Sequence, residues 1–106
     1  MVRADQIPRG APAAFHQPPL DVHLVAVREA WTDAQRAHDT EHPPFVAALN
    51  ALAAAARASG VPVTELLKAA DSLTRSVVGG DPKLVWDHVR PQVGRRLIQQ
   101  YYASPP

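Results

Sequence analysis

The sequence predicts an all-α protein, a compact bundle of four helices, and three observations support this fold class. Apolar residues recur at steps of three and four in four successive segments, which is the period of one helix face. No segment shows the strict apolar–polar alternation of a β-strand. Proline and glycine fall between the periodic segments, where helices begin or end. A chain of 106 residues has the size of one domain, so we expect residues 20–106 to form a single helical domain.

The N-terminal residues 1–19 are rich in proline and alanine, and we expect them to form a flexible arm. Their prolines are Pro8, Pro12, Pro18 and Pro19. A segment of this composition has little apolar surface with which to offset the entropy lost on ordering. Phe15 and Leu20 are the side chains that would dock if the arm folded back onto the bundle.

The first two helices are predicted at residues 21–39 and 43–59. Asp21 follows a proline pair and is a favourable N-cap. The prolines at 43–44 end the first helix and are tolerated in the first turn of the second. Gly60 is placed as the C-terminal cap of the second helix. The expected core-facing residues are Leu24, Val27, Trp31, Ala34 and His38 in the first helix, and Phe45, Leu49, Leu52 and Ala56 in the second.

The third and fourth helices are predicted at residues 63–78 and 81–102. The pair Gly79–Gly80 ends the third helix, and the pair Asp81–Pro82 supplies a cap and an N-terminal proline for the fourth. Pro91 removes one backbone hydrogen bond inside the fourth helix, which predicts a kink there or two shorter helices. The core-facing residues of the third helix are Val63, Leu66, Ala70, Leu73 and Val77.

The last predicted helix carries apolar residues on two opposite faces. At about 100° per residue, one stripe contains Trp86, Val89, Val93 and Leu97, and the other contains Leu84, Pro91, Ile98 and Tyr102. The outer face of a surface helix in a monomer is normally polar. The second stripe therefore calls for a second copy of the chain, another protein, or the N-terminal arm. Alternatively, a kink at Pro91 rotates half of the helix and brings both stripes into one core.

Composition excludes several classes of function. The chain has 11 Lys+Arg against 10 Asp+Glu, a net charge of +1, which argues against a polybasic or acidic coat. The absence of cysteine excludes disulfides, thiolate zinc sites and cysteine nucleophiles. No apolar run approaches the roughly 20 residues of a membrane span, and no signal-peptide core is visible, so we expect a cytoplasmic protein. The Ala-, Arg-, Val- and Pro-rich usage is typical of a bacterial coding sequence of high GC content.

These patterns predict a small non-catalytic interaction module that docks on a protein partner or self-associates as a homo-oligomer. The sequence contains no nucleophile-elbow motif and no Gly-rich phosphate loop, and no cofactor is expected. The residues expected to contact the partner are Leu84, Ile98, Tyr101 and Tyr102.

A second hypothesis is a helix-turn-helix protein that binds nucleic acid. Ala56 and Gly60 have the spacing of the helix-turn-helix corner, and the next helix presents basic side chains. Glu65 and Asp71 on the same helix would repel phosphates. The same spacing occurs in ordinary helical corners, and basic residues on a helix are commonly solvated flanks. The candidate contacts are Lys68 and Arg75, with Arg95 and Arg96 on the last helix.

A third hypothesis is a histidine metal site. His38 and His42 stand in the pattern H-x-x-E-H, the letters of the inverted zincin motif, in which two histidines bind zinc. His42 precedes a proline and is therefore biased out of the helix that would orient it. No third ligand is marked, although His23, His88 and Asp71 are available to converge. The simpler interpretation is that His38 ends the core stripe and His42 caps the following helix.

Overall fold

The computed structural model describes residues 10–37, 41–76 and 86–105, with the side chains of residues 35, 37, 73–76 and 86–90 left aside. They form a short 3-10 helix, η2 (Ala13–His16), and four α-helices, α1 (Leu20–Ala37), α2 (Pro43–Ala58), α3 (Val63–Ser76) and α4 (Trp86–Ala103). No β-strand occurs within the described ranges. The all-α prediction is confirmed, and the helix ends agree with the expected ones to within about two residues, apart from the start of the fourth helix. Its predicted start, Asp81, lies outside the described residues.

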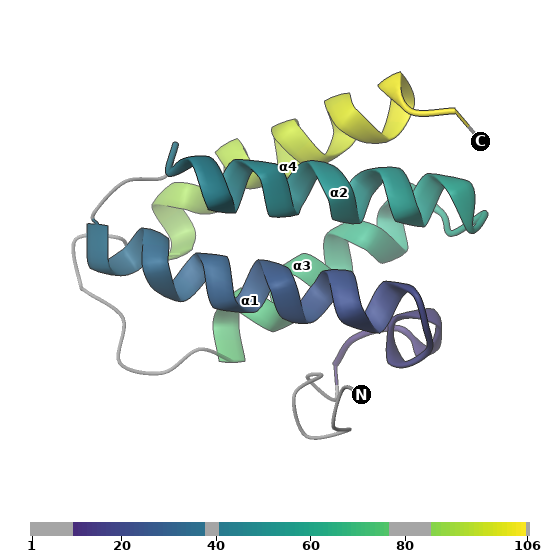
Figure 1. The fold of residues 1–106 in the computed structure, drawn as a ribbon, viewed down its shortest axis with the longest axis horizontal. Coiled ribbons are helices and arrows are strands. Elements are labelled where there is room, and N and C mark those ends of the chain that lie inside the picture. Colours follow the sequence, from purple (N-terminus) through teal and green to yellow (C-terminus); the bar gives the residue numbers. More distant parts are fainter. Residues whose placement is uncertain (1–9, 38–40, 77–85, 106) are drawn as a thin grey trace.

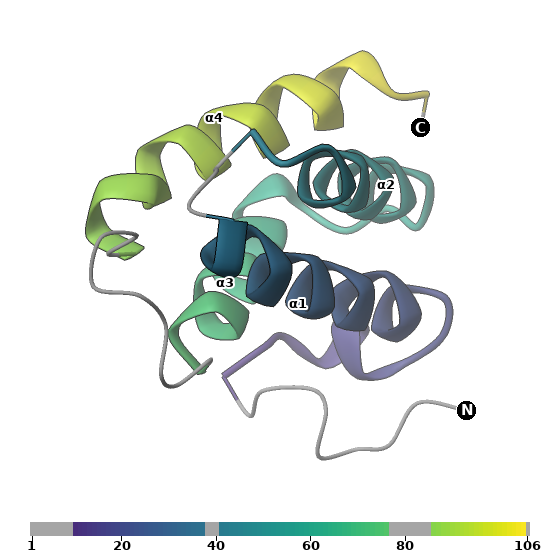
Figure 2. The ribbon, with the colours of Figure 1, turned by 60° about the vertical axis from the view of Figure 1, so that its left-hand side comes forward.

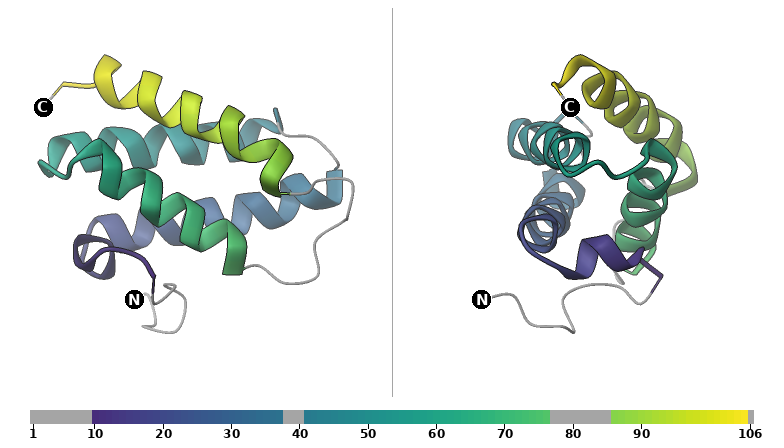
Figure 3. Two further views of the ribbon diagram at one scale, coloured as in Figure 1. Left: turned by 180° about the vertical axis from the view of Figure 1, so that it is seen from behind. Right: turned by 90° about the vertical axis from the view of Figure 1, so that its right-hand side faces the viewer.

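The helices form a bundle in which α2 occupies a central position. Its principal neighbours are α1 and α4. Helix α4 runs beside α2 and parallel to it (Figure 1). Seen end on, α1 and α2 lie on one side of the molecule and α3 and α4 on the other (Figure 3). The outer side of α4 is not covered by any other described helix (Figure 2).

The core forms where the apolar stripes of the helices meet. Trp31 of α1 and Phe45 of α2 are 1% and 0% exposed, and their ring centroids lie 5.3 Å apart at an interplanar angle of 44°. Tilted aromatic pairs of this kind add roughly 0.5–1.5 kcal/mol beyond the burial of their area. The other buried residues that the helical period predicted in these two helices are Leu24, Val27, Ala34, Leu49, Leu52 and Ala56. His38 lies outside the described residues.

The turn between α2 and α3 is a Schellman motif. The Gly60 N–H donates to the Arg57 carbonyl at 3.1 Å, and the Val61 N–H donates to the Ala56 carbonyl at 3.0 Å. Gly60 adopts φ +74°, a left-handed conformation that favours glycine. Val61 and Ala56, which accompany this turn as its apolar contact, are both buried. The turn therefore fixes where the backbone of Val61 lies.

The N-terminal segment differs from its expectation over residues 10–19. Phe15 in η2 is 0% exposed and Ala11 is buried, so this part of the chain belongs to the core. A Cβ atom at Gly10 would lie only 2.9 Å from the Ser72 Oγ of α3, which shows how closely the backbone approaches that helix. The burial of one large aromatic side chain contributes about 1.5–3 kcal/mol, which offsets part of the entropy lost when this segment is ordered. Residues 1–9 of the expected arm lie outside the described residues.

Helix α4 is a single helix that contains Pro91. The alternative of two shorter helices is therefore wrong, because the prolyl ring removes one backbone hydrogen bond without ending the helix. A bend at Pro91 stays a prediction. The helix closes at Ser104, whose Oγ donates to the Gln100 carbonyl at 2.7 Å.

We expect Phe15→Ala to lower the free energy of unfolding by about 3–5 kcal/mol, since it leaves a cavity where a fully buried ring packed. Chemical denaturation of the full chain measures this change. Gln17→Ala, an exposed substitution in the same segment, is the control and is expected to change stability by less than about 0.5 kcal/mol. A loss below about 1 kcal/mol for Phe15→Ala would mean that the segment does not belong to the core.

Candidate functional surface

Helix α4 buries one face and exposes the other. Val93 and Leu97 are 4% and 0% exposed and point into the bundle, as the helical period predicted. On the other face Ile98 is 40% exposed and Tyr102 is 64% exposed. The alternative in which a kink brings both stripes into one core is therefore wrong for these two residues. Leu84, the further residue expected on the outer face, lies outside the described residues.

Tyr101 was expected to contact a partner, but the structure places it in the core. Its side chain is 6% exposed, and its hydroxyl donates a hydrogen bond of 2.6 Å to the Val61 carbonyl. That carbonyl is presented by the Schellman turn, which is distant in sequence from α4. The side chain therefore satisfies a buried acceptor within its own chain, and the outer face retains Tyr102 alone of the tyrosine pair.

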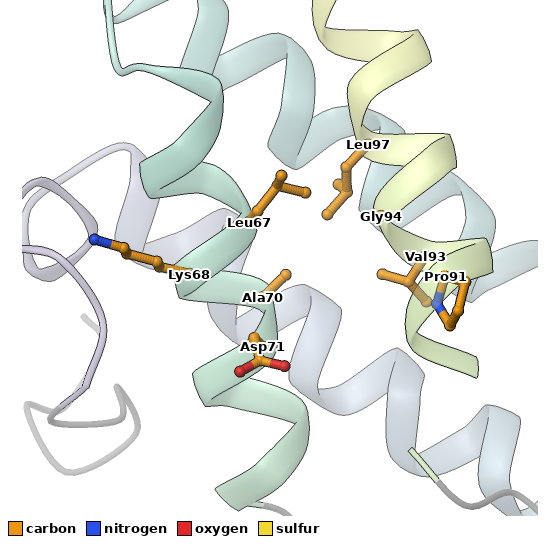
Figure 4. A pocket seen from close by; sticks show the side chains of 8 residues that line it. All are labelled: Leu67, Lys68, Ala70, Asp71, Pro91, Val93, Gly94 and Leu97. Carbon is orange, nitrogen blue, oxygen red and sulfur yellow. The ribbon is translucent and has the colours of Figure 1, made fainter. Parts of the chain in front are cut away.

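An apolar groove lies between α3 and α4 (Figure 4). Its volume is about 380 Å³ and its lining residues are Leu67, Lys68, Ala70, Asp71, Pro91, Val93, Gly94 and Leu97. Leu67 and Leu97 point toward one another across it, whereas the Lys68 side chain extends away from α4 (Figure 4). Because Gly94 has no side chain, the groove stays open beside Leu67. Ile98 lies one helical turn beyond Gly94, so the groove and the outer face of α4 adjoin.

Arg57, near the C-terminal end of α2, makes cation–π contacts with the two tyrosines. Its guanidinium carbon lies 5.0 Å from the centroid of the Tyr101 ring and 5.7 Å from that of Tyr102. The two rings meet edge to face, with centroids 5.2 Å apart at 83°. The Arg57 Nε is shielded from solvent and has no hydrogen-bond partner among the described residues. Cation–π contact thus holds a half-buried guanidinium in place beside the exposed Tyr102 ring.

The four residues proposed for nucleic acid do not form one described patch. Lys68 is exposed on α3 and directed away from α4 (Figure 4). Arg96 lies on the side of α4 that faces α2, and its Nη2 lies 2.9 Å from the carboxylate of Glu41, just before α2. Arg95 is exposed on the outer side of α4. The side chain of Arg75 is outside the description.

Of the two proposed metal ligands, the structure describes only His42. His42 is the N-cap residue of α2, and its carbonyl accepts hydrogen bonds from the amides of Phe45 and Val46, both at 3.0 Å. His38 lies outside the described residues. Among the residues that are described, no group of three metal-ligating side chains is found. In the same residues, no helix combines the length and the hydropathy needed to span a membrane.

Sequence reasoning missed Arg57. The residue stands in an Ala-rich stretch, and its local pattern suggests only a cation that suits the C-terminal end of a helix. Its contact with Tyr101 and Tyr102 joins residues more than forty positions apart along the chain, so no periodicity reveals it.

Comparison of the chain with protein-family models, with curated proteins and with solved structures gave no match. The surface formed by Ile98, Tyr102, the adjoining groove and Arg57 is therefore the basis on which a function can be inferred.

We expect Tyr101→Phe to lower the free energy of unfolding by about 1–2 kcal/mol, because it leaves the buried Val61 carbonyl without its hydrogen-bond donor. Thermal or chemical unfolding measures the change. The neighbouring substitution Tyr102→Phe is the matched control: its ring is 64% exposed, and its stability is expected to stay within about 0.5 kcal/mol of the natural protein. Equal effects of the two substitutions would show that Tyr101 is not anchored in the core.

Proposed function

We propose that the protein is a small non-catalytic interaction module that docks on a protein partner, or on a second copy of itself, through the outer face of α4. The observation that carries this proposal is the exposure of two large apolar side chains, Ile98 at 40% and Tyr102 at 64%, beside an apolar groove. The third large hydrophobic residue exposed in the described part of the chain, Val22 of α1, is 55% exposed and belongs to another helix.

The residue types of this surface support a binding role. Tyrosine and arginine are the side chains most often found, with tryptophan, at the energetic centre of protein interfaces. Tyr102 supplies a large rigid ring, and Arg57 is already oriented by its contacts with the tyrosines. A side chain that is ordered before association loses less conformational entropy when it binds. Contiguous exposed apolar residues adjoining a groove also tend to mark interaction sites rather than ordinary monomer surface.

The groove favours docking over catalysis. Its lining is mostly aliphatic, with Lys68 and Asp71 as the two charged residues, and the Lys68 side chain leads away from α4 (Figure 4). Such a lining fits an apolar side chain of a partner.

A location in the bacterial cytoplasm is proposed on composition alone, which includes the absence of cysteine.

We expect Ile98→Glu to weaken the association by about 30-fold, because it places a charge within an apolar contact. The matched control is Val22→Glu, which changes an exposed apolar residue on α1 in the same way and should leave the association unchanged. Light scattering over a concentration series detects self-association, and thermal unfolding should show that both variants remain folded.

Site-specific photo-crosslinking identifies a partner of a different kind. A photoreactive phenylalanine analogue at position 102 is expected to form a discrete cross-linked product in cells that produce the protein, and Ile98→Glu is expected to remove it. The same analogue at position 22 is the control. Two results together would contradict the proposed function. The first is an identical cross-linking pattern from positions 102 and 22. The second is a monomeric natural protein in which the only effect of Ile98→Glu is to unfold the chain.

A further inference from the structure

Three residues of α4 share the exposed face at successive helical turns. Arg95, Ile98 and Tyr102 are spaced at i, i+3 and i+7, so they lie on one side of the helix. All three are exposed. With a rise of about 1.5 Å per residue, Arg95 and Tyr102 are about 10 Å apart along the axis. The apolar residue Ile98 therefore lies between a cation at one end and the Tyr102 ring at the other.

Arg57 supplies a second cation at the Tyr102 end. Its guanidinium lies 5.7 Å from the centre of the Tyr102 ring. A cation–π contact does not use the N–H donors of the guanidinium, so these remain available for a carboxylate. The exposed face is thus an apolar centre with one arginine at each end.

Neither arginine has an acidic partner in the described part of the chain. The ion pairs found there join Arg36 to Asp33 and Arg96 to Glu41, and neither Arg57 nor Arg95 takes part in one. Residues 91–103 contain no Asp or Glu. Asp71 lines the groove at its Pro91 end and already has an interaction of its own. Among the described residues, the charge of this face is therefore positive.

We infer that the partner presents an acidic helical segment to the outer face of α4, in which two carboxylates about two turns apart pair with Arg57 and Arg95. An apolar side chain between the carboxylates packs on Ile98 and Tyr102. This inference rests on the proposed function and names the chemistry of its partner. Arginine–carboxylate pairs of fixed geometry are among the strongest polar contacts at interfaces, and they add orientation to the apolar contact.

The same charges disfavour a second copy of this chain as the occupant. A two-fold interface brings the same patch of both subunits together. Arg95 and Arg57 of one copy would then face the same residues of the other, and residues 91–103 contain no Asp or Glu that could separate them. A partner of opposite charge meets no such repulsion.

The test is a selection of helical peptides from a randomised display library on the full-length protein. The selected pool is expected to carry two acidic residues about two turns apart with an apolar residue between them. A synthetic peptide from the pool is expected to lose about tenfold in affinity when one glutamate is changed to glutamine. Raising the salt concentration should lower the affinity of the acidic peptide more than that of its glutamine counterpart.

The protein variants locate the contact. Arg57→Gln and Arg95→Gln should each lower the affinity for the acidic peptide about tenfold. Arg36→Gln on α1 removes an exposed arginine in the same way and should leave this affinity unchanged. Arg95 is exposed, so its substitution tests the contact even if Arg57→Gln disturbs the fold, which circular dichroism monitors.

The outcomes separate this inference from the proposed function. Selected peptides without acidic enrichment, bound in a manner that depends on Ile98 but not on either arginine, would overturn the inference and leave the proposed function standing. A homodimer that Ile98→Glu dissociates would likewise overturn the inference and leave the proposed function standing. Binding of a DNA or RNA oligonucleotide that both arginine variants weaken would overturn it in favour of a phosphate ligand. Peptide binding that is indifferent to Ile98→Glu would contradict both.

Discussion

The burial of one face of α4 is the constraint on which the exposed surface depends. Val93 and Leu97 pack into the bundle, and Tyr101 extends this face to the turn between α2 and α3. Successive residues of an α-helix are about 100° apart around its axis. Once Leu97 and Tyr101 point inward, the next residue in each case, Ile98 and Tyr102, is directed to the outside. The exposed apolar pair is therefore a geometric consequence of the buried one.

The rotation of α4 is fixed by an interaction between distant parts of the sequence. Gly60 permits the left-handed residue of the Schellman turn, and the turn presents the Val61 carbonyl. The Tyr101 hydroxyl donates to that carbonyl, and the Arg57 guanidinium packs over the tyrosine pair. The turn thus ties the C-terminal part of α4 to the corner between α2 and α3 through a backbone carbonyl and a tyrosine. The charged and apolar parts of the surface are positioned by the same contacts.

The sequence predicted those features that depend on local periodicity. The stripes of α1 and α2 and the opposite placement of Leu97 and Ile98 follow from the helical repeat, because neighbours along one helix fix the faces. The burial of Tyr101 did not follow, and the sequence named Phe15 only as a side chain that would dock if the arm folded back. Tyr101 lies at the edge of the buried stripe, and only the Val61 carbonyl decides its orientation. Phe15 is buried because residues of other helices surround it, which the composition of a Pro-rich segment does not reveal.

The central claim is that α4 holds Ile98 and Tyr102 outside a folded single chain. NMR of a dilute sample with a soluble gadolinium chelate measures this directly, since the chelate broadens signals of side chains that it can approach. The account predicts strong broadening of the Ile98 methyl groups and the Tyr102 ring, with Leu97 and the Tyr101 ring protected. Equal protection of all four side chains in a sample shown to be monomeric would contradict it.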